Sequence, residues 1–141
     1  GLEAKNFKDL PRGFKSLLST PESGSACKRW NLFLRWMIRT EYPDVGLWNI
    51  SPALLRIPLD AHVHRLSWLL GITKRRQADD KAVTEITEAL RRLDPQDPIR
   101  YDFSLSHLGI SGDCKSKPVP VICKPCPLTG ICRISPYCEV K

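Results

Sequence analysis

The segment I-P-L-D-A-H-V-H-R-L-S-W-L-L-G, residues 57–71, decides the fold of the surrounding chain. Asp60 stands directly before a run whose apolar residues recur at helical spacing, and aspartate is a favoured residue at a helix N-cap. Gly71 follows the run, and glycine often ends a helix because it adopts the left-handed conformation easily. The segment therefore predicts a helix over residues 61–70 with Asp60 at its head.

Helical patterns also surround this segment, and no alternating β pattern of useful length or internal repeat interrupts them. Trp30 and Phe33 share one broad apolar face with Leu34, Met37 and Ile38. Tryptophans within helices are more often core residues, which applies to Trp30, Trp36 and Trp68. Proline is well tolerated in a first helical turn, as after Ser51 and at Pro98. These patterns predict an all-α fold, with helices at 26–39, from 51–52, at 78–93, and from Pro98 to about 108 with Gly109 as its stop.

Composition narrows the class of protein. The chain has 141 residues, of which 42% are hydrophobic, enough for one packed domain. It contains no apolar run near the roughly 20 residues that cross a bilayer. It also opens without a secretory signal. We expect a cytoplasmic protein with no membrane partner.

Positive charge gathers at the two ends of the chain. The net charge is +7, of which residues 1–40 contribute +5 and residues 114–141 contribute +4, whereas residues 41–113 carry −2. Clustered positive charge commonly binds a polyanion, and nucleic acid is the first candidate. A merely solvated basic surface is the alternative that charge alone leaves open.

Five of the six cysteines lie in a proline-rich tail, which divides the chain into residues 1–113 and a cysteine-rich loop, residues 114–141. Their spacing is C-x8-C-x2-C-x5-C-x5-C, beginning at Cys114 and ending at Cys138. Four thiolates in such a loop can hold zinc or a [4Fe–4S] cluster. Disulfides are a third option, which the missing export signal disfavours. Spacing alone does not separate zinc from iron–sulfur.

The Asp60 segment and the cysteine spacing together resemble the helix-hairpin-helix DNA glycosylases that carry an iron–sulfur cluster. In that superfamily a segment V-D-T-H-V-x-R-V holds the catalytic aspartate, and a C-x6-C-x2-C-x5-C loop follows. The resemblance implies that Asp60 is the catalytic carboxylate and that Cys138 is spare. It implies a helix-hairpin-helix domain with a C-terminal [4Fe–4S] loop, whose ligands are Cys114, Cys123, Cys126 and Cys132.

The catalytic lysine of bifunctional members follows a hairpin of the type L-P-G-V-G-x-K-T. The segment L-S-T-P-E-S-G-S-A-C-K-R, residues 18–29, is similar but has a longer turn without G-x-G, and it implies Lys28 as the nucleophile. The long interval from Lys28 to Asp60 resembles the archaeal 8-oxoguanine glycosylases. Both segments also resemble the uncharacterised, prokaryotic DUF2400 family. Without these resemblances, Asp60 is an ordinary N-cap and Lys28 an ordinary surface lysine.

The resemblance implies a base-excision DNA glycosylase with AP-lyase activity, acting near the nucleoid on duplex DNA with an oxidised purine such as 8-oxoguanine. Helices expected before the hairpin would come from a preceding segment or a second chain. A non-catalytic DNA-binding module and a zinc-held helical interaction domain remain alternatives. Further candidates are a substrate pocket at Cys27 and Trp48, and DNA-binding residues Gly24, Ser25, Arg29, His62, Lys115, Lys117 and Lys124.

Overall fold

The computed structural model describes residues 9, 12 and 19–137. Within this part of the chain it contains helices but no β-strand, only an isolated bridge between Ser25 and Asp79. The all-α prediction is confirmed. None of the described helices is long and apolar enough to cross a membrane. The elements are η2 (Pro21–Ser23), α2 (Lys28–Ile38), η3 (Pro52–Leu54), α3 (Ala61–Leu69), α4 (Asp80–Arg91), α5 (Asp102–Ile110) and α6 (Pro120–Cys123).

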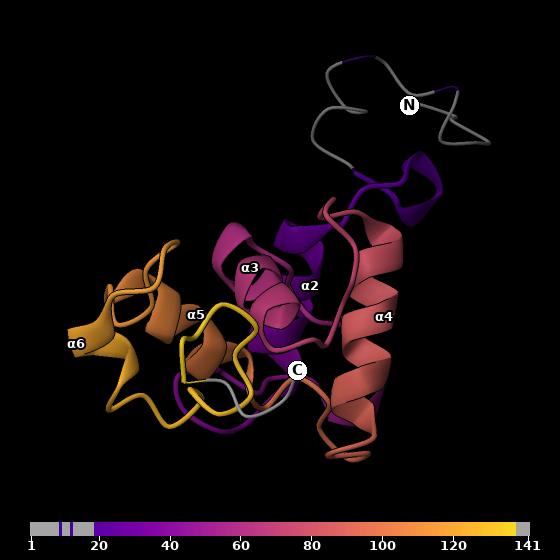
Figure 1. Cartoon of the computed structure of the whole chain (residues 1–141). Coiled ribbons are helices and arrows are strands. Elements are labelled where there is room, and N and C mark those ends of the chain that lie inside the picture. Colours follow the sequence, from indigo (N-terminus) through magenta and orange to yellow (C-terminus); the bar gives the residue numbers. More distant parts are fainter. Residues whose placement is uncertain (1–8, 10–11, 13–18, 138–141) are drawn as a thin grey trace.

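Helices α2 and α3 occupy the middle of the molecule in Figure 1, with α4 on one side and α5, α6 and the cysteine loop on the other. An extended segment, residues 55–59, joins the core between η3 and α3, and the backbone N–H of Ile57 donates to the Thr87 hydroxyl of α4 at 3.1 Å. The main core cluster is apolar. Its buried members are Ile38, Leu55, Ile57, Leu59, Val63, Leu66, Leu69, Ala82, Val83, Ile86, Leu90, Ile99 and Leu105.

Helix α4 follows its sequence pattern closely. The Asp79 carboxylate caps it by accepting the Ala82 N–H at 2.8 Å, as expected of an N-cap aspartate. Its apolar residues Val83, Ile86 and Leu90 form one buried stripe. The helix is slightly shorter than the predicted range 78–93.

Helix α2 departs from its predicted burial pattern. Ile38 is buried as expected, but Trp30 and Trp36 are 43% and 44% exposed, so their prediction as core residues is wrong. Arg35 and Arg39 are buried instead. Carboxylates from three other segments surround these two guanidinium groups, which makes their burial favourable. Those carboxylates belong to Asp44, Asp97 and Asp102.

Helix α5 begins and ends later than its pattern predicts. Residues 98–101 form turns, and the helix runs from Asp102 through Gly109 to Ile110, so Gly109 is not its stop. At Gly109 an added Cβ would lie 2.7 Å from the Cβ and Nδ1 atoms of His62 in α3. The glycine therefore serves the close crossing of α3 and α5. Gly71, by contrast, follows α3 in the left-handed region as predicted, with φ of 76°.

Candidate active site and cysteine loop

The structure brings Lys28 and Asp60 together from 32 positions apart in the sequence. The Lys28 Nζ atom lies 3.7 Å from the Asp60 Oδ2 atom, and each residue stands at the N-terminal end of a helix. The Lys28 side chain is half exposed, whereas that of Asp60 is only 16% exposed. An amine open to solvent therefore faces a carboxylate that the protein largely encloses.

The two carboxylate oxygens of Asp60 have different partners. Oδ1 accepts the Val63 N–H at 2.8 Å and so caps α3. Oδ2 faces Lys28 and accepts the Ser106 hydroxyl of α5 at 3.4 Å. One oxygen thus fixes the side chain to its own helix while the other remains available to the amine, so Asp60 combines the cap and the ion pair.

The turn before Lys28 is fixed by hydrogen bonds and by burial. Cys27 precedes α2 in the left-handed region with φ of 47°, and its Sγ lies 3.4 Å from the carbonyl oxygens of both Ser19 and Ser25. The Asp80 N–H donates to the Gly24 carbonyl at 3.1 Å, which ties this turn to the start of α4. Cys27 is buried, so its thiol packs the beginning of α2.

A buried ionic network lies near the Lys28–Asp60 pair. Its residues are not among the site residues that we expected from the sequence. Arg35 Nη1 donates to Asp102 Oδ2 at 2.5 Å, and Arg35 Nε contacts Asp44 Oδ1 at 3.1 Å. Burial, followed by the nearby charges of Asp60 and Asp44, raises the pKa of Asp102 to about 6 despite the opposing effect of Arg35. Asp102 is one helical turn before Ser106, so the network and the Asp60 carboxylate share α5.

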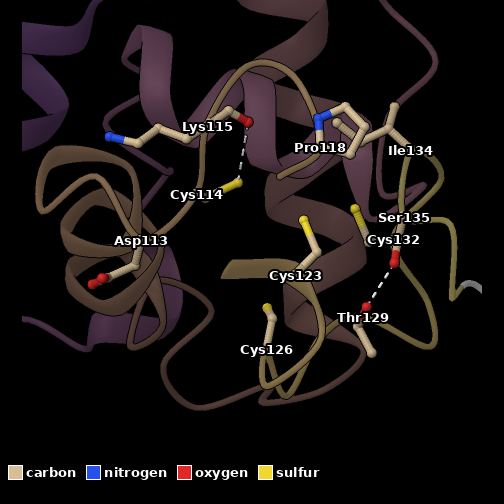
Figure 2. A pocket seen from close by; sticks show the side chains of 10 residues that line it. All are labelled: Asp113, Cys114, Lys115, Pro118, Cys123, Cys126, Thr129, Cys132, Ile134 and Ser135. Atoms are coloured by element: carbon tan, nitrogen blue, oxygen red, sulfur yellow. Dashed lines mark hydrogen bonds between the residues drawn. The ribbon is translucent and has the colours of Figure 1, made fainter. Parts of the chain in front are cut away.

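The four cysteines expected as ligands line one shared hollow. Figure 2 shows them around this space, with the Asp113 and Lys115 side chains directed away from it. Their thiols are free of disulfides. The fifth cysteine of the tail, Cys138, lies outside the described residues. The cysteines in the hollow are Cys114, Cys123, Cys126 and Cys132.

Four thiols around one hollow are a donor set suited to an iron–sulfur cluster, in which each thiolate binds a different iron atom. Four thiols also suit a single zinc ion. The chemistry of the donor set therefore fits either group.

Helix α3 fastens this loop through Arg65, another residue that the sequence analysis did not select. Arg65 Nη1 lies 3.3 Å from the Cys114 Sγ, and Nη2 donates to the Cys114 carbonyl at 2.9 Å. At the end of α3, the Leu69 carbonyl accepts the Arg133 N–H at 2.9 Å. The helix that begins with Asp60 thus also holds both ends of the cysteine-lined hollow. The only signal in the sequence was the position of Arg65 within the segment that resembles V-D-T-H-V-x-R-V.

A comparison with protein families identifies the family of the helical part of the chain. Residues 3–111 match the family described as "Protein of unknown function (DUF2400)". The chain belongs to the DUF2400 family. The DUF2400 match includes both Lys28 and Asp60 and ends three residues before Cys114. No curated protein and no solved structure shows significant similarity to the chain.

The remaining candidates of this DUF2400 chain fall into three groups. Gly24, Ser25 and Arg29 flank Lys28 on the turn and the first turn of α2, and Arg29 is exposed. His62 is partly buried against α5, and Trp48 is 40% exposed with its ring edge-on to Phe33 at 5.7 Å. The last group is exposed on the cysteine loop and consists of Lys115, Lys117 and Lys124.

Proposed function

We propose that this protein is a base-excision DNA glycosylase with associated AP-lyase activity, acting on an oxidised purine such as 8-oxoguanine. The observation that carries the proposal is the approach of the Lys28 amine to the Asp60 carboxylate, at 3.7 Å. A lysine amine beside a proton acceptor is the arrangement that Schiff-base chemistry requires. The preference for 8-oxoguanine rests only on the similarity in the lysine-to-aspartate interval.

In this mechanism Asp60 Oδ2 accepts a proton from the Lys28 ammonium, and the neutral amine attacks C1′ of a nucleotide flipped from the duplex. A bond forms between Nζ and C1′ while the glycosidic bond breaks, and the base leaves with the electron pair and takes up a proton. Loss of the second amine proton and opening of the sugar ring give a Schiff base. A base then removes a proton from C2′, and the 3′ phosphate leaves with the electron pair of the C3′–O bond, which cleaves the strand.

The cysteine loop has a supporting role in this proposal. Cys114, Cys123, Cys126 and Cys132 would hold a [4Fe–4S] cluster, which when bound supplies a structural cross-link to a segment that has little apolar core of its own. Arg65 and Leu69 carry this loop on the same helix as Asp60. The basic side chains of the loop would then face the phosphate backbone of the DNA.

Borohydride trapping tests the proposal directly, because reduction of the Schiff base leaves a stable protein–DNA adduct. We expect the full chain to form this adduct on duplex DNA containing 8-oxoguanine and on duplex DNA containing an abasic site. Lys28→Ala should abolish it. Lys81→Ala removes an exposed lysine from α4 and serves as the matched control.

Asp60→Asn separates the two roles of the aspartate, since asparagine is also a good N-cap but accepts no proton. We expect it to keep α3 intact and to slow adduct formation by about 10²-fold or more. An adduct that persists in Lys28→Ala would exclude Lys28 as the nucleophile. Binding of DNA without any adduct would favour a non-catalytic DNA-binding module, and a colourless, zinc-containing protein without DNA affinity would favour the interaction domain.

A further inference from the structure

The connection between α3 and α4 carries a concentration of positive charge that neither the sequence analysis nor the proposed mechanism uses. Residues 61–78 hold four basic side chains and no acidic one. Three of these, Lys74, Arg75 and Arg76, are consecutive in the connection, and the fourth is Arg65. In Figure 1 the connection runs from the end of α3 to the start of α4.

Hydrogen bonds fix this connection to three other elements. The His64 ring of α3 lies with Nε2 3.1 Å from the Arg75 carbonyl oxygen. The Thr73 hydroxyl donates to Glu85 Oε2 of α4 at 2.8 Å, and the bridge between Ser25 and Asp79 joins the connection to the turn before Lys28. The basic side chains therefore project from an ordered segment that begins at the cysteine-loop end of α3 and finishes beside the Lys28 turn.

The three consecutive basic residues differ in their partners. Arg75 forms a two-point ion pair with Asp79, through Nε to Oδ1 at 3.0 Å and Nη2 to Oδ2 at 2.5 Å. The hydrogen bonds from Arg75 contribute most to lowering the pKa of Asp79 to about 2, so this pair stays charged near neutral pH. Lys74 and Arg76 are exposed and have no ion-pair partner among the described residues. Their charge is thus available to an external anion.

A groove lies beside the connection, and some of these basic residues line it. Its lining combines His64, Arg65 and Trp68 of α3 with Arg75 and Arg76. Lys74 lines a second hollow, which shares Arg75 and Arg76 with the groove and also includes Glu85. The guanidinium of Arg133, from the cysteine loop, lies 5.8 Å from the centroid of the Trp68 ring. The groove is open and bordered by cations from both α3 and the loop that α3 carries. An extended polyanion fits such a surface better than a compact ligand does.

We propose that Lys74 and Arg76 contact the phosphodiester backbone of duplex DNA and that this groove carries the strand between the cysteine loop and the Lys28 turn. The inference rests on the proposed function, because it places the same DNA on a second surface. Phosphate contacts of this kind supply affinity and register without reading sequence. Lys74 and Arg76 are therefore binding residues, whereas Arg75 holds the connection in place.

The salt dependence of binding counts such contacts, because each neutralised phosphate releases condensed counterions and steepens the slope of log K against log salt by about 0.9. We would measure the affinity of the full chain for an undamaged duplex and for a duplex with an abasic site at several salt concentrations. Lys74→Ala and Arg76→Ala should each lower the slope by about 1 on both duplexes, and the double variant by about 2.

Arg92→Ala is the matched control, because it removes an exposed arginine at the far end of α4, about 18 Å along the helix from its start. We expect its slope to equal that of the unchanged chain. Since Lys74 and Arg76 lack ion pairs within the described structure, their replacement should leave the melting temperature within about 2 °C. A melting temperature preserved alongside a reduced slope separates lost contacts from lost folding.

Trapping and salt dependence distinguish the failure of this inference from the failure of the proposed function. A reduced slope in the double variant without any borohydride adduct would retain the groove and reject the lyase. An adduct with an unchanged slope would retain the lyase and overturn the groove. A chain without measurable affinity for either duplex would also overturn the groove, as would a slope that Arg92→Ala lowers equally.

Discussion

Helices α2 and α4 have similar lengths and opposite ways of being buried. Helix α4 buries the apolar stripe that its sequence predicts, including Ile86 at the centre. Helix α2 buries Arg35 and exposes Trp30 and Phe33 on its outer face. The apolar content of α2 would have supported the same arrangement as α4, so the difference arises from the rest of the chain.

The partners available to each helix explain this contrast. Helix α4 packs against segments that offer apolar side chains, since its Val83 and Ile86 belong to the same core cluster as Ile57. Arg35 of α2 and Arg39 directly after the helix face carboxylates, which offset the cost of burying their charge. The buried face of α2 therefore combines the charged Arg35 with Asn31 and Ile38. The first residue of the helix, Lys28, reaches the Asp60 carboxylate.

Removing a charge from the buried face of α2 should have the largest effect. Arg35→Ala would leave Asp44 and Asp102 without this guanidinium, and breaking a buried pair typically costs about 3–5 kcal/mol. Ile86→Ala should cost a comparable amount, about 2–5 kcal/mol, through a cavity in the core. Urea unfolding of both variants gives the comparison.

The two losses should respond differently to a second substitution. Asp102→Asn should recover part of the stability of Arg35→Ala, since one uncompensated buried charge disappears, and it should not rescue Ile86→Ala. Equal effects of Asp102→Asn in both backgrounds would show that Arg35 and Asp102 are not energetically coupled.

The pH dependence of stability should also distinguish the ionic network that α2 buries from the N-cap of α4. Because the pKa of Asp102 is raised to about 6, the folded chain holds a proton between pH 4 and pH 6 that the unfolded chain releases. The free energy of unfolding should therefore fall as pH rises through this window, by up to about 3 kcal/mol from this group. Asp102→Asn should remove this component, which is measured as the difference between the two unfolding free energies at each pH.

Asp79, the N-cap of α4, should change the free energy of unfolding with pH in the opposite direction. Its pKa is lowered to about 2, chiefly by Arg75, so its contribution to stability is present above pH 4 and is lost as pH falls towards 2. A constant difference between the unchanged chain and Asp102→Asn from pH 4 to pH 7 would contradict the raised pKa of Asp102.

The exposed face of α2 should show the smallest effect. Trp30 is 43% exposed and meets Phe33 edge-on, with 6.4 Å between ring centroids. We expect Trp30→Ala to change the free energy of unfolding by about 1 kcal/mol or less. A loss as large as that of Ile86→Ala, measured in the same urea experiment, would show that this aromatic face is packed in solution.

The sequence was informative where one segment suffices to determine structure. The Asp60 cap, the left-handed Gly71 and the stripe of α4 all follow from neighbouring residues. The expectation that Lys28 and Asp60 share one site came from a family resemblance, because no local sequence pattern spans the interval between them. The inverted burial of α2 escaped prediction because it depends on carboxylates up to 67 residues away, as in the bond from Arg35 to Asp102.

The candidate site shows the same division. Four cysteine ligands could be proposed from spacing and resemblance, and the structure gathers them at one hollow. Ser106 was not selected, because a serine on α5 has no distinctive neighbours in the sequence. Arg65 was not selected although it matches the arginine of the V-D-T-H-V-x-R-V segment, because that pattern does not show its contact with Cys114. Their contacts exist only once α3 has packed against α5 and the cysteine loop.

Gly109 has a consequence for how this chain can change over evolutionary time. The crossing of α3 and α5 leaves no room for a β-carbon beside His62, and the same crossing sets the distance from Ser106 to Asp60. Because the His62 β-carbon is one of the two nearest atoms, even alanine at position 62 would keep the clash. A residue larger than glycine at 109 therefore requires glycine at 62 or a wider crossing of the two helices. The lack of a side chain at Gly109 thus limits which substitutions keep the Asp60 carboxylate within reach of Ser106.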